Sequence, residues 1–250
     1  MKPFIYPILM LLNIPSFSQS EFRETQQSYS RVRTAYLEKW EPLKERLSEI
    51  DIDTNHFELY IQAFKQEGTF EVWIRDRSSE KFVLFLSYEI CAASGQSGPK
   101  RAQGDMQVPE GFYSIDVFNP WSNFYLSLGI NYPNPSDRIL GERGRLGGDI
   151  YIHGSCVTIG CIPLTDHFIK EFYILCVEAR SQGQKEIPVT LYPARMNPDK
   201  LRILTEEFSG DSDRLNLWSD LKIAYEIFQL DQQIPVVEFL EDGRHHIHKE

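Results

Sequence analysis

The spacing of apolar residues divides the chain into an N-terminal helical segment and a β-rich centre. Val32, Trp40 and Leu47 belong to an apolar stripe that recurs every three or four residues among charged positions, so we predict a helix over residues 30–49. Short aromatic or β-branched runs bounded by turn residues follow, and this pattern is typical of strands. The predicted strands cover residues 57–64, 70–74, 82–90, 112–117, 124–128 and 150–153. The centre is therefore predicted to be a β-sandwich or a barrel-like unit.

Helical spacing returns at residue 165, where Phe168, Phe172 and Ala179 fall on one face, and we predict a helix that ends near residue 180. A strand is predicted over 187–192. Residues 196–250 form an appendix with two predicted helices, 198–208 and 214–230, and a strand over 234–240. From residue 197 onward twelve acidic residues face six basic ones, so this appendix is acidic.

The first 18 residues have the layout of a secretory signal peptide. Lys2 precedes an apolar run over 4–14, and small residues follow around Ser18. A buried strand or an uncleaved anchor is the alternative interpretation. With cleavage near Ser18, the predicted divisions are a helical segment over 19–54, a β-rich central domain over 55–195 and the appendix. Export would place the cysteines in an oxidising compartment.

Charge and composition exclude several classes of protein. The chain has 250 residues, a net charge of -10 and 25% charged residues, so a nucleic-acid-binding surface is disfavoured. No apolar run is long enough to predict stable membrane insertion after the signal peptide is removed. Four cysteines are too few for a disulfide scaffold.

The segment from Asp149 to Asp166 carries the strongest chemical signal. A strand ends at His153, a glycine-punctuated loop follows, and Cys161 comes just before a predicted helix. A thiol attacks a carbonyl as the thiolate, which a neighbouring imidazole or helix start favours. His153 is therefore a candidate general base and acid for a nucleophilic Cys161, and Gly160 allows backbone amides to face an oxyanion. A packed structural pair is the alternative interpretation.

Several further motifs support the catalytic interpretation, because they occur in the same order as in a known family. These are Gly98-Pro99-Lys100, Gln103-Gly104-Asp105, Pro109-Glu110-Gly111-Phe112-Tyr113, and the His-Gly and Gly-Cys pairs at 153–154 and 160–161. Together they resemble the L,D-transpeptidase catalytic (YkuD) domain family, in particular its YafK-like branch of murein-processing proteins, over residues 57–192.

This resemblance implies a mainly β fold that acts on peptidoglycan stem peptides without a cofactor. Cys161 matches the nucleophile, which would form a thioester with a tetrapeptide donor and pass the acyl group to an amine acceptor. His153 matches the general base and acid, and the Gly160 and Cys161 amides match the oxyanion donors. A carbonyl or hydroxyl near Gly154 and Ser155 would complete the triad.

The chain departs from the family pattern at Pro163, where many members have arginine, and the loop before Cys161 is short. Substrate binding is therefore predicted to involve other residues. The candidates are Gly154, Ser155 and Thr158 in the loop, and Lys100, Arg101 and Arg138, with Arg143 and Arg145 as further cations. Because of these departures, a hydrolase that cuts a bond to the stem diamino acid, including one that releases a wall-attached protein, stays an alternative. A non-catalytic wall-binding module is another.

The other cysteines and histidines are interpreted as structural. A bond between Cys156 and Cys161 would silence the nucleophile, so we expect Cys156 to be reduced and packed. Cys91 and Cys176 are expected to be small core residues. The histidines at 245, 246 and 248 are expected to lie in a solvated tail that binds no metal.

Overall fold

The computed structural model describes residues 19–249, so the predicted signal peptide lies outside the described residues. Its main feature is one curled sheet of eight strands with the order β3-β2-β1-β8-β4-β5-β6-β7. The strands are β1 (Phe57–Phe64), β2 (Thr69–Asp76), β3 (Val83–Glu89), β4 (Gly111–Asn119), β5 (Ser127–Ile130), β6 (Tyr151–His153), β7 (Ile162–Pro163) and β8 (Ile187–Tyr192). The prediction of a mainly β, barrel-like centre is confirmed.

The sheet is antiparallel except for two pairs. β1 pairs with β8 in parallel, and β6 pairs with β7 in parallel. The curl brings the two edges of the sheet together at one end. There the backbone N–H of Cys91, just after β3, donates to the carbonyl of Pro163 in β7 over 3.1 Å. Residues just beyond β3 therefore lie beside the β6–β7 connection.

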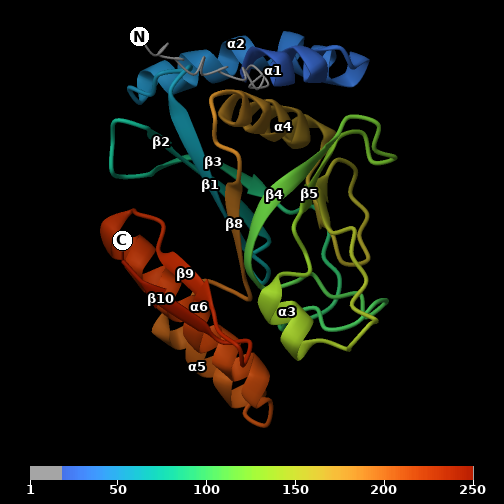
Figure 1. Ribbon diagram of the computed structural model, residues 1–250, viewed down its shortest axis with the longest axis vertical. Helices are drawn as coiled ribbons and strands as arrows, with labels where there is room; N and C mark the ends of the chain where they lie inside the picture. The colour runs from blue at the N-terminus through green and yellow to red at the C-terminus, as the bar shows by residue number, and fades with distance from the viewer. Residues whose placement is uncertain (1–18, 250) are drawn as a thin grey trace, which may run out of the picture.

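Helices cover one side of this sheet, as Figure 1 shows. α4 (Asp166–Ser181) packs on the sheet, and α1 (Gln19–Gln27) and α2 (Ser30–Glu49) pack on α4. The hydroxyl of Thr165 accepts from the N–H of Phe168 and caps the start of α4, as the change of period at residue 165 indicates. The predicted helix over 30–49 is confirmed, and its stripe is buried at Val32, Leu43 and Leu47.

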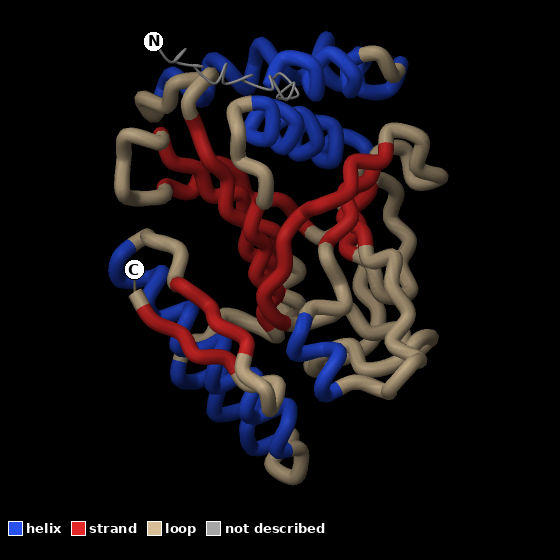
Figure 2. The backbone as a smooth tube through the Cα atoms, viewed as in Figure 1, coloured by secondary structure: helices blue, strands red, loops and turns tan. Residues whose placement is uncertain are grey.

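The appendix lies at the opposite end, where Figure 2 shows helices beside a separate two-stranded hairpin. Its elements are α5 (Pro198–Glu207), α6 (Ser212–Asp231), β9 (Val236–Phe239) and β10 (His245–His248), and the short α3 (Pro135–Leu140) lies in the loop region after β5. Trp218 and Leu204 share a buried cluster with Phe64 and Tyr192 of the sheet. The appendix is thus packed onto the eight-stranded sheet, while its predicted boundary at residue 196 stays a prediction.

The prediction of a solvated histidine tail is wrong for His245, whereas His246 is exposed. His245 is buried, and its Nδ1 lies 3.1 Å from a carboxylate oxygen of Asp220 in α6. The sequence gives no hint of this contact because it joins residues 25 positions apart. Within residues 19–249, no helix combines the length and apolar character that crossing a bilayer requires.

The predicted states of Cys91 and Cys156 are also wrong, because a disulfide joins them. The curl of the sheet places Cys91, beyond β3, next to the loop that follows β6, which carries Cys156. The bond fastens this loop and leaves Cys161 and Cys176 as free thiols.

Removing this disulfide is expected to destabilise the fold. Cross-linking residues 65 positions apart restricts the unfolded chain, so a Cys91→Ser and Cys156→Ser double variant should lose about 2 to 4 kcal/mol of unfolding free energy in urea titrations. Thiol labelling of the denatured wild type without reductant should modify only Cys161 and Cys176. Labelling of all four cysteines, or an unchanged urea midpoint in the double variant, would contradict the bond.

Candidate active site

The loop from Gly154 to Cys161 connects two neighbouring parallel strands, so its ends meet. Ile152 pairs with Ile162 and His153 with Pro163, and the N–H of Leu164 donates to the carbonyl of His153 over 2.7 Å. His153 is thus the last residue of β6 and Cys161 directly precedes β7. The two candidate catalytic side chains line one pocket of about 290 Å³. Its other lining residues are Asn119, Ser122, Asn123, Phe124, Ser127, Asp149 and Tyr151.

The hydrogen bond of His153 determines its tautomer. Nδ1 lies 2.5 Å from the carbonyl oxygen of Gly154. A carbonyl can only accept, so Nδ1 carries the hydrogen and Nε2 of the neutral ring is left as the acceptor. The ring of Phe124 lies 4.6 Å away between centroids and helps to bury the imidazole. The Gly154 carbonyl therefore orients the ring. The sequence interpretation had left open whether a carbonyl or a hydroxyl takes this part.

Burial keeps both candidate groups uncharged at neutral pH. Burial lowers the pKa of His153 and outweighs the opposite effect of the Gly154 hydrogen bond. Burial also raises the pKa of the Cys161 thiol. The carboxylate of Asp149 raises this pKa further, whereas the charge of Lys100 lowers it. The sequence argument looked for a thiol with a lowered pKa. The structure instead presents a thiol and a neutral imidazole, so the proton would leave the sulfur during attack.

Glycines are required at two points of this loop. Gly160 has φ of +134°, and a Cβ there would lie 3.0 Å from the carbonyl oxygen of Gln107. A Cβ at Gly154 would lie 2.6 Å from a carboxylate oxygen of Asp166. That carboxylate also accepts from the N–H of Ser155 over 2.9 Å. The loop is therefore held between the 91–110 region and the start of α4.

Thr158 occupies the amides that the sequence interpretation assigned to the oxyanion. Its Oγ1 accepts from the N–H of Cys161 over 2.8 Å and from that of Gly160 over 3.1 Å, and it donates to the carbonyl of Cys161. Thr158 thus organises the nucleophile loop instead of projecting toward substrate. An oxyanion role for the two amides stays a prediction and requires Thr158 to share or release them.

The predicted cationic contacts to substrate differ in whether their charges are already paired within the fold. Lys100 is buried and its Nζ lies 2.6 Å from a carboxylate oxygen of Asp105. Arg101 pairs with Asp137 over 3.0 Å. The charges of both residues are used within the fold, which argues against their predicted role. Arg138 is exposed and lines a pocket of about 270 Å³ that shares Asp149 and Tyr151 with the pocket of Cys161.

Neither Arg143 nor Arg145 lines the pocket of His153 and Cys161. Both are exposed, and Arg145 pairs with Glu142 over 2.7 Å. Several pocket residues were missed by the sequence interpretation, namely Asn119, Asn123, Phe124, Asp149 and Tyr151. Strand alternation was an available signal for Tyr151, which shares a face with His153 two positions later.

Cys161 also lines a second, smaller pocket. It measures about 50 Å³. Its lining comes from the β1–β2 turn, the chain after β3 and the start of β7, with Lys65, Gly68, Ile90, Ala92, Ala93, Ser94, Val108 and Ile162. Cys161 therefore contributes to the lining of both pockets.

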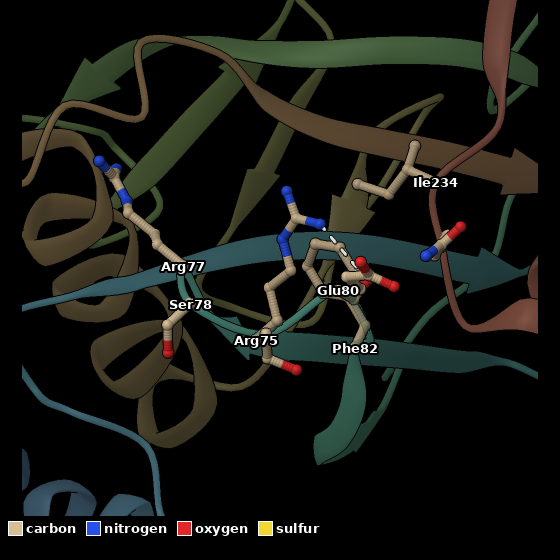
Figure 3. A pocket seen from close by; sticks show the side chains of 8 residues that line it. Arg75, Arg77, Ser78, Glu80, Phe82 and Ile234 are labelled. Carbon is tan, nitrogen blue, oxygen red and sulfur yellow. Dashed lines mark hydrogen bonds between the residues drawn. The ribbon is translucent and has the colours of Figure 1, made fainter. Parts of the chain in front are cut away.

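The larger pocket in Figure 3, of about 480 Å³, is a poorer candidate for a catalytic site. It lies at the β2–β3 turn, whereas Gly68 and Ile90 mark the opposite ends of these strands beside Cys161. Arg75 projects into it, but its guanidinium is paired with Glu58 over 2.8 Å. The pocket offers neither a thiol nor an imidazole.

Comparisons with known proteins identify the family of this chain. The family model of the L,D-transpeptidase catalytic domain, YkuD, matches residues 51–190. A protein of Escherichia coli strain K12, provisionally named as the L,D-transpeptidase YafK, is 35% identical over 193 residues, which cover 76% of this chain and 74% of that protein.

Two solved structures are more distantly similar. The helical cell shape determining protein Pgp2 from Campylobacter jejuni is 18% identical with a TM-score of 0.44, covering 80% of each chain. Bd1075 of Bdellovibrio bacteriovorus is 17% identical with a TM-score of 0.39, covering 73% of this chain and 77% of that one. The matched family model spans more than half of this sequence, including both His153 and Cys161. The chain therefore belongs to the L,D-transpeptidase catalytic domain family.

Proposed function

We propose that this protein is an exported cysteine acyltransferase that acts on peptidoglycan stem peptides. The observation that carries the proposal is a free, partly exposed Cys161 thiol that lines a pocket together with a neutral His153. The family supports peptidoglycan as the substrate. Export to the periplasm or cell envelope is part of the proposal, and a disulfide near the site is consistent with an oxidising compartment.

The proposed reaction has two acyl transfers. The Cys161 sulfur attacks the carbonyl carbon of the stem diamino acid while Nε2 of His153 accepts the thiol proton. The peptide C–N bond then breaks, the imidazolium gives its proton to the leaving amine of the terminal alanine, and a thioester remains on Cys161. An amine of a second stem attacks this thioester, which restores the thiol and forms the cross-link.

The pocket of about 290 Å³ that His153 and Cys161 line offers suitable contacts for the donor stem. Asparagine and serine side chains on its wall can exchange hydrogen bonds with peptide amides. Asp149 lies at its border with the adjoining pocket, which also contains Arg138. The carboxylate of Asp149 suits the free amino group of a diamino-acid side chain, and the guanidinium of Arg138 suits its free carboxyl group. We propose this adjoining pocket as the place for that side chain.

Incubation with a disaccharide tetrapeptide tests the proposal. The expected product is a cross-linked dimer with release of alanine, identified by mass spectrometry. A tripeptide without any dimer would identify a hydrolase in place of a transferase. An unchanged substrate, with a folded protein and an unmodified Cys161, would overturn the catalytic proposal and favour a wall-binding module.

The pH dependence should reflect a buried neutral imidazole. His153 must be unprotonated to accept the thiol proton, so activity should be lost as the pH falls through its pKa. Because burial lowers that pKa, the acid midpoint of kcat/KM should lie below the ordinary histidine value of 6.5. The observed step belongs to the coupled His153 and Cys161 pair. A His167→Ala control should leave the profile unchanged, and a midpoint at or above 6.5 would contradict the assignment.

A further inference from the structure

The hairpin of β9 and β10 gathers three metal-binding side chains on one face. Glu238 in β9 is directly opposite His246 in β10. His248 follows His246 by two positions, and alternate strand residues project from the same face. The three side chains therefore share one surface of the hairpin, while His245 projects from the other.

The ligand atoms of this trio, defined as Glu238, His246 and His248, are close together. One atom from each side chain lies within 4.8 Å of the other two. In a tetrahedral zinc site, neighbouring nitrogen or oxygen ligands lie about 3.4 Å apart. Rotation of these side chains on the hairpin can close such a difference without a change of register.

The trio has few competing partners. In the part of the chain that the structure describes, no hydrogen bond or ion pair within the fold engages any of its side chains. Nδ1 of His248 is shielded from solvent and has no hydrogen-bond partner among those residues. A shielded nitrogen without a partner is costly unless a ligand satisfies it. Nδ1 of His248 is therefore free to bind a ligand.

The opposite face fixes the hairpin to α6. Asp220 accepts from the N–H of His245 over 3.0 Å, from Nε of Arg244 over 3.1 Å and from a second nitrogen of Arg244. Burial would raise the pKa of Asp220, but the hydrogen bonds from His245 and Arg244 outweigh it and lower that pKa. The carboxylate is therefore a charged anchor. The trio is presented on a firmly held support instead of a loose tail.

We propose that Glu238, His246 and His248 bind a divalent transition-metal ion, with Zn²⁺ as the expected metal. Two imidazoles and one carboxylate form a ligand set that zinc accepts, with an open position for water. Mg²⁺ and Ca²⁺ prefer sets made only of oxygen ligands.

The ion would join β9 to β10 in a hairpin that has no third strand. Two-stranded hairpins are only marginally stable by themselves. A ligand that binds the folded form selectively raises its stability. Zinc should therefore protect the hairpin and raise the thermal unfolding temperature of the full chain, independently of the chemistry at Cys161.

Calorimetric titration of the purified full chain with ZnCl₂ tests this site. The experiment uses a Cys161→Ala background, so that the free active-site thiol cannot bind the metal. We expect one Zn²⁺ per chain, at least about tenfold weaker binding in His246→Ala and in His248→Ala, and no comparable heat with MgCl₂. Thermal unfolding should rise with zinc only where the trio is intact.

Matched controls separate the trio from other side chains of the same kind. His56→Ala removes an exposed imidazole elsewhere, and Glu241→Gln removes a neighbouring carboxylate outside the trio. Both should keep the wild-type affinity for zinc. Circular dichroism without zinc should show each variant folded. The proposal is overturned if zinc does not bind, or if the His246→Ala and His248→Ala variants bind it as tightly as the controls.

Discussion

Replacing Cys161 by alanine is expected to lower the rate of cross-link formation by at least about a thousandfold, with little effect on stability. The sulfur forms the covalent intermediate in the proposed reaction, and no other thiol lines its pocket. Cys176 is fully buried in α4, so Cys176→Ala is the matched control and should retain activity. The measurement is the rate of dimer formation from a disaccharide tetrapeptide.

Acylation by a carbapenem gives an independent readout of the same residue. One added acyl group should appear on Cys161 in the wild type and in Cys176→Ala, and none in Cys161→Ala. Full activity of Cys161→Ala would show that the pocket performs other chemistry. Loss of activity in both variants to the same extent would point to damaged packing instead of a missing nucleophile.

Local sequence patterns predicted the elements whose formation depends on their own residues. The helix over 30–49 and the strands over 57–64 and 187–192 have the predicted bounds. In the helix the apolar spacing identifies the buried face, whereas both strands are buried on their two faces. The strand predicted over 124–128 is instead β5 (Ser127–Ile130), because its pairing with β4 and β6 determines its bounds. The two residues of β7 qualify as a strand only through their pairing with β6.

The disulfide shows why long-range pairing was not predictable. Four cysteines allow three complete pairings as well as partial ones, and spacing does not distinguish among them. Cys91 meets Cys156 because the sheet curls and brings the end of β3 to the loop after β6. The bond fastens the nucleophile loop without consuming Cys161. The sequence argument considered only the nearer pair of Cys156 and Cys161.

The active site was predictable where its chemistry lies within one loop. His153 and Cys161 were identified from their residue types, the intervening glycines and the family resemblance. The orienting carbonyl of Gly154 and the ring of Phe124 depend on loop conformation and strand packing. The pKa directions likewise depend on burial, which the sequence does not give. These features required the structure.

The second large effect is expected at Glu110, which joins the catalytic sheet to the appendix. Its carboxylate is inaccessible to solvent, lies 2.9 Å from Nζ of Lys65, and accepts from the N–H of Gly98 over 2.7 Å and from Nε1 of Trp218 over 2.7 Å. Glu110→Ala would leave a largely buried ammonium and two donors without this partner. We expect it to lower the unfolding free energy by about 3 to 5 kcal/mol in urea titrations.

Two further variants separate the contributions to this effect. Trp218→Phe keeps an aromatic ring in α6 and removes only the Nε1 donor, so its cost should be smaller, about 1 to 2 kcal/mol. Glu206→Ala breaks an exposed pair with Arg202 and should cost no more than about 0.5 kcal/mol. A Glu110→Ala variant as stable as Glu206→Ala would show that the buried carboxylate is not the link between the two parts.

The same substitution should also disturb the surroundings of Cys161. Lys65 donates to the carbonyls of Gln96, Gly98 and Val108, and so holds the loop that lines the smaller pocket beside the sulfur. Without Glu110 the ammonium has less to fix its position, so hydrogen exchange in residues 92–108 should increase in Glu110→Ala well below its unfolding temperature. Exchange in α2, which packs on α4, should change little under the same conditions. Equal changes in both regions would indicate only global destabilisation. A change confined to residues 92–108 would show that the appendix supports the wall of the pocket beside Cys161 through Trp218 and Glu110.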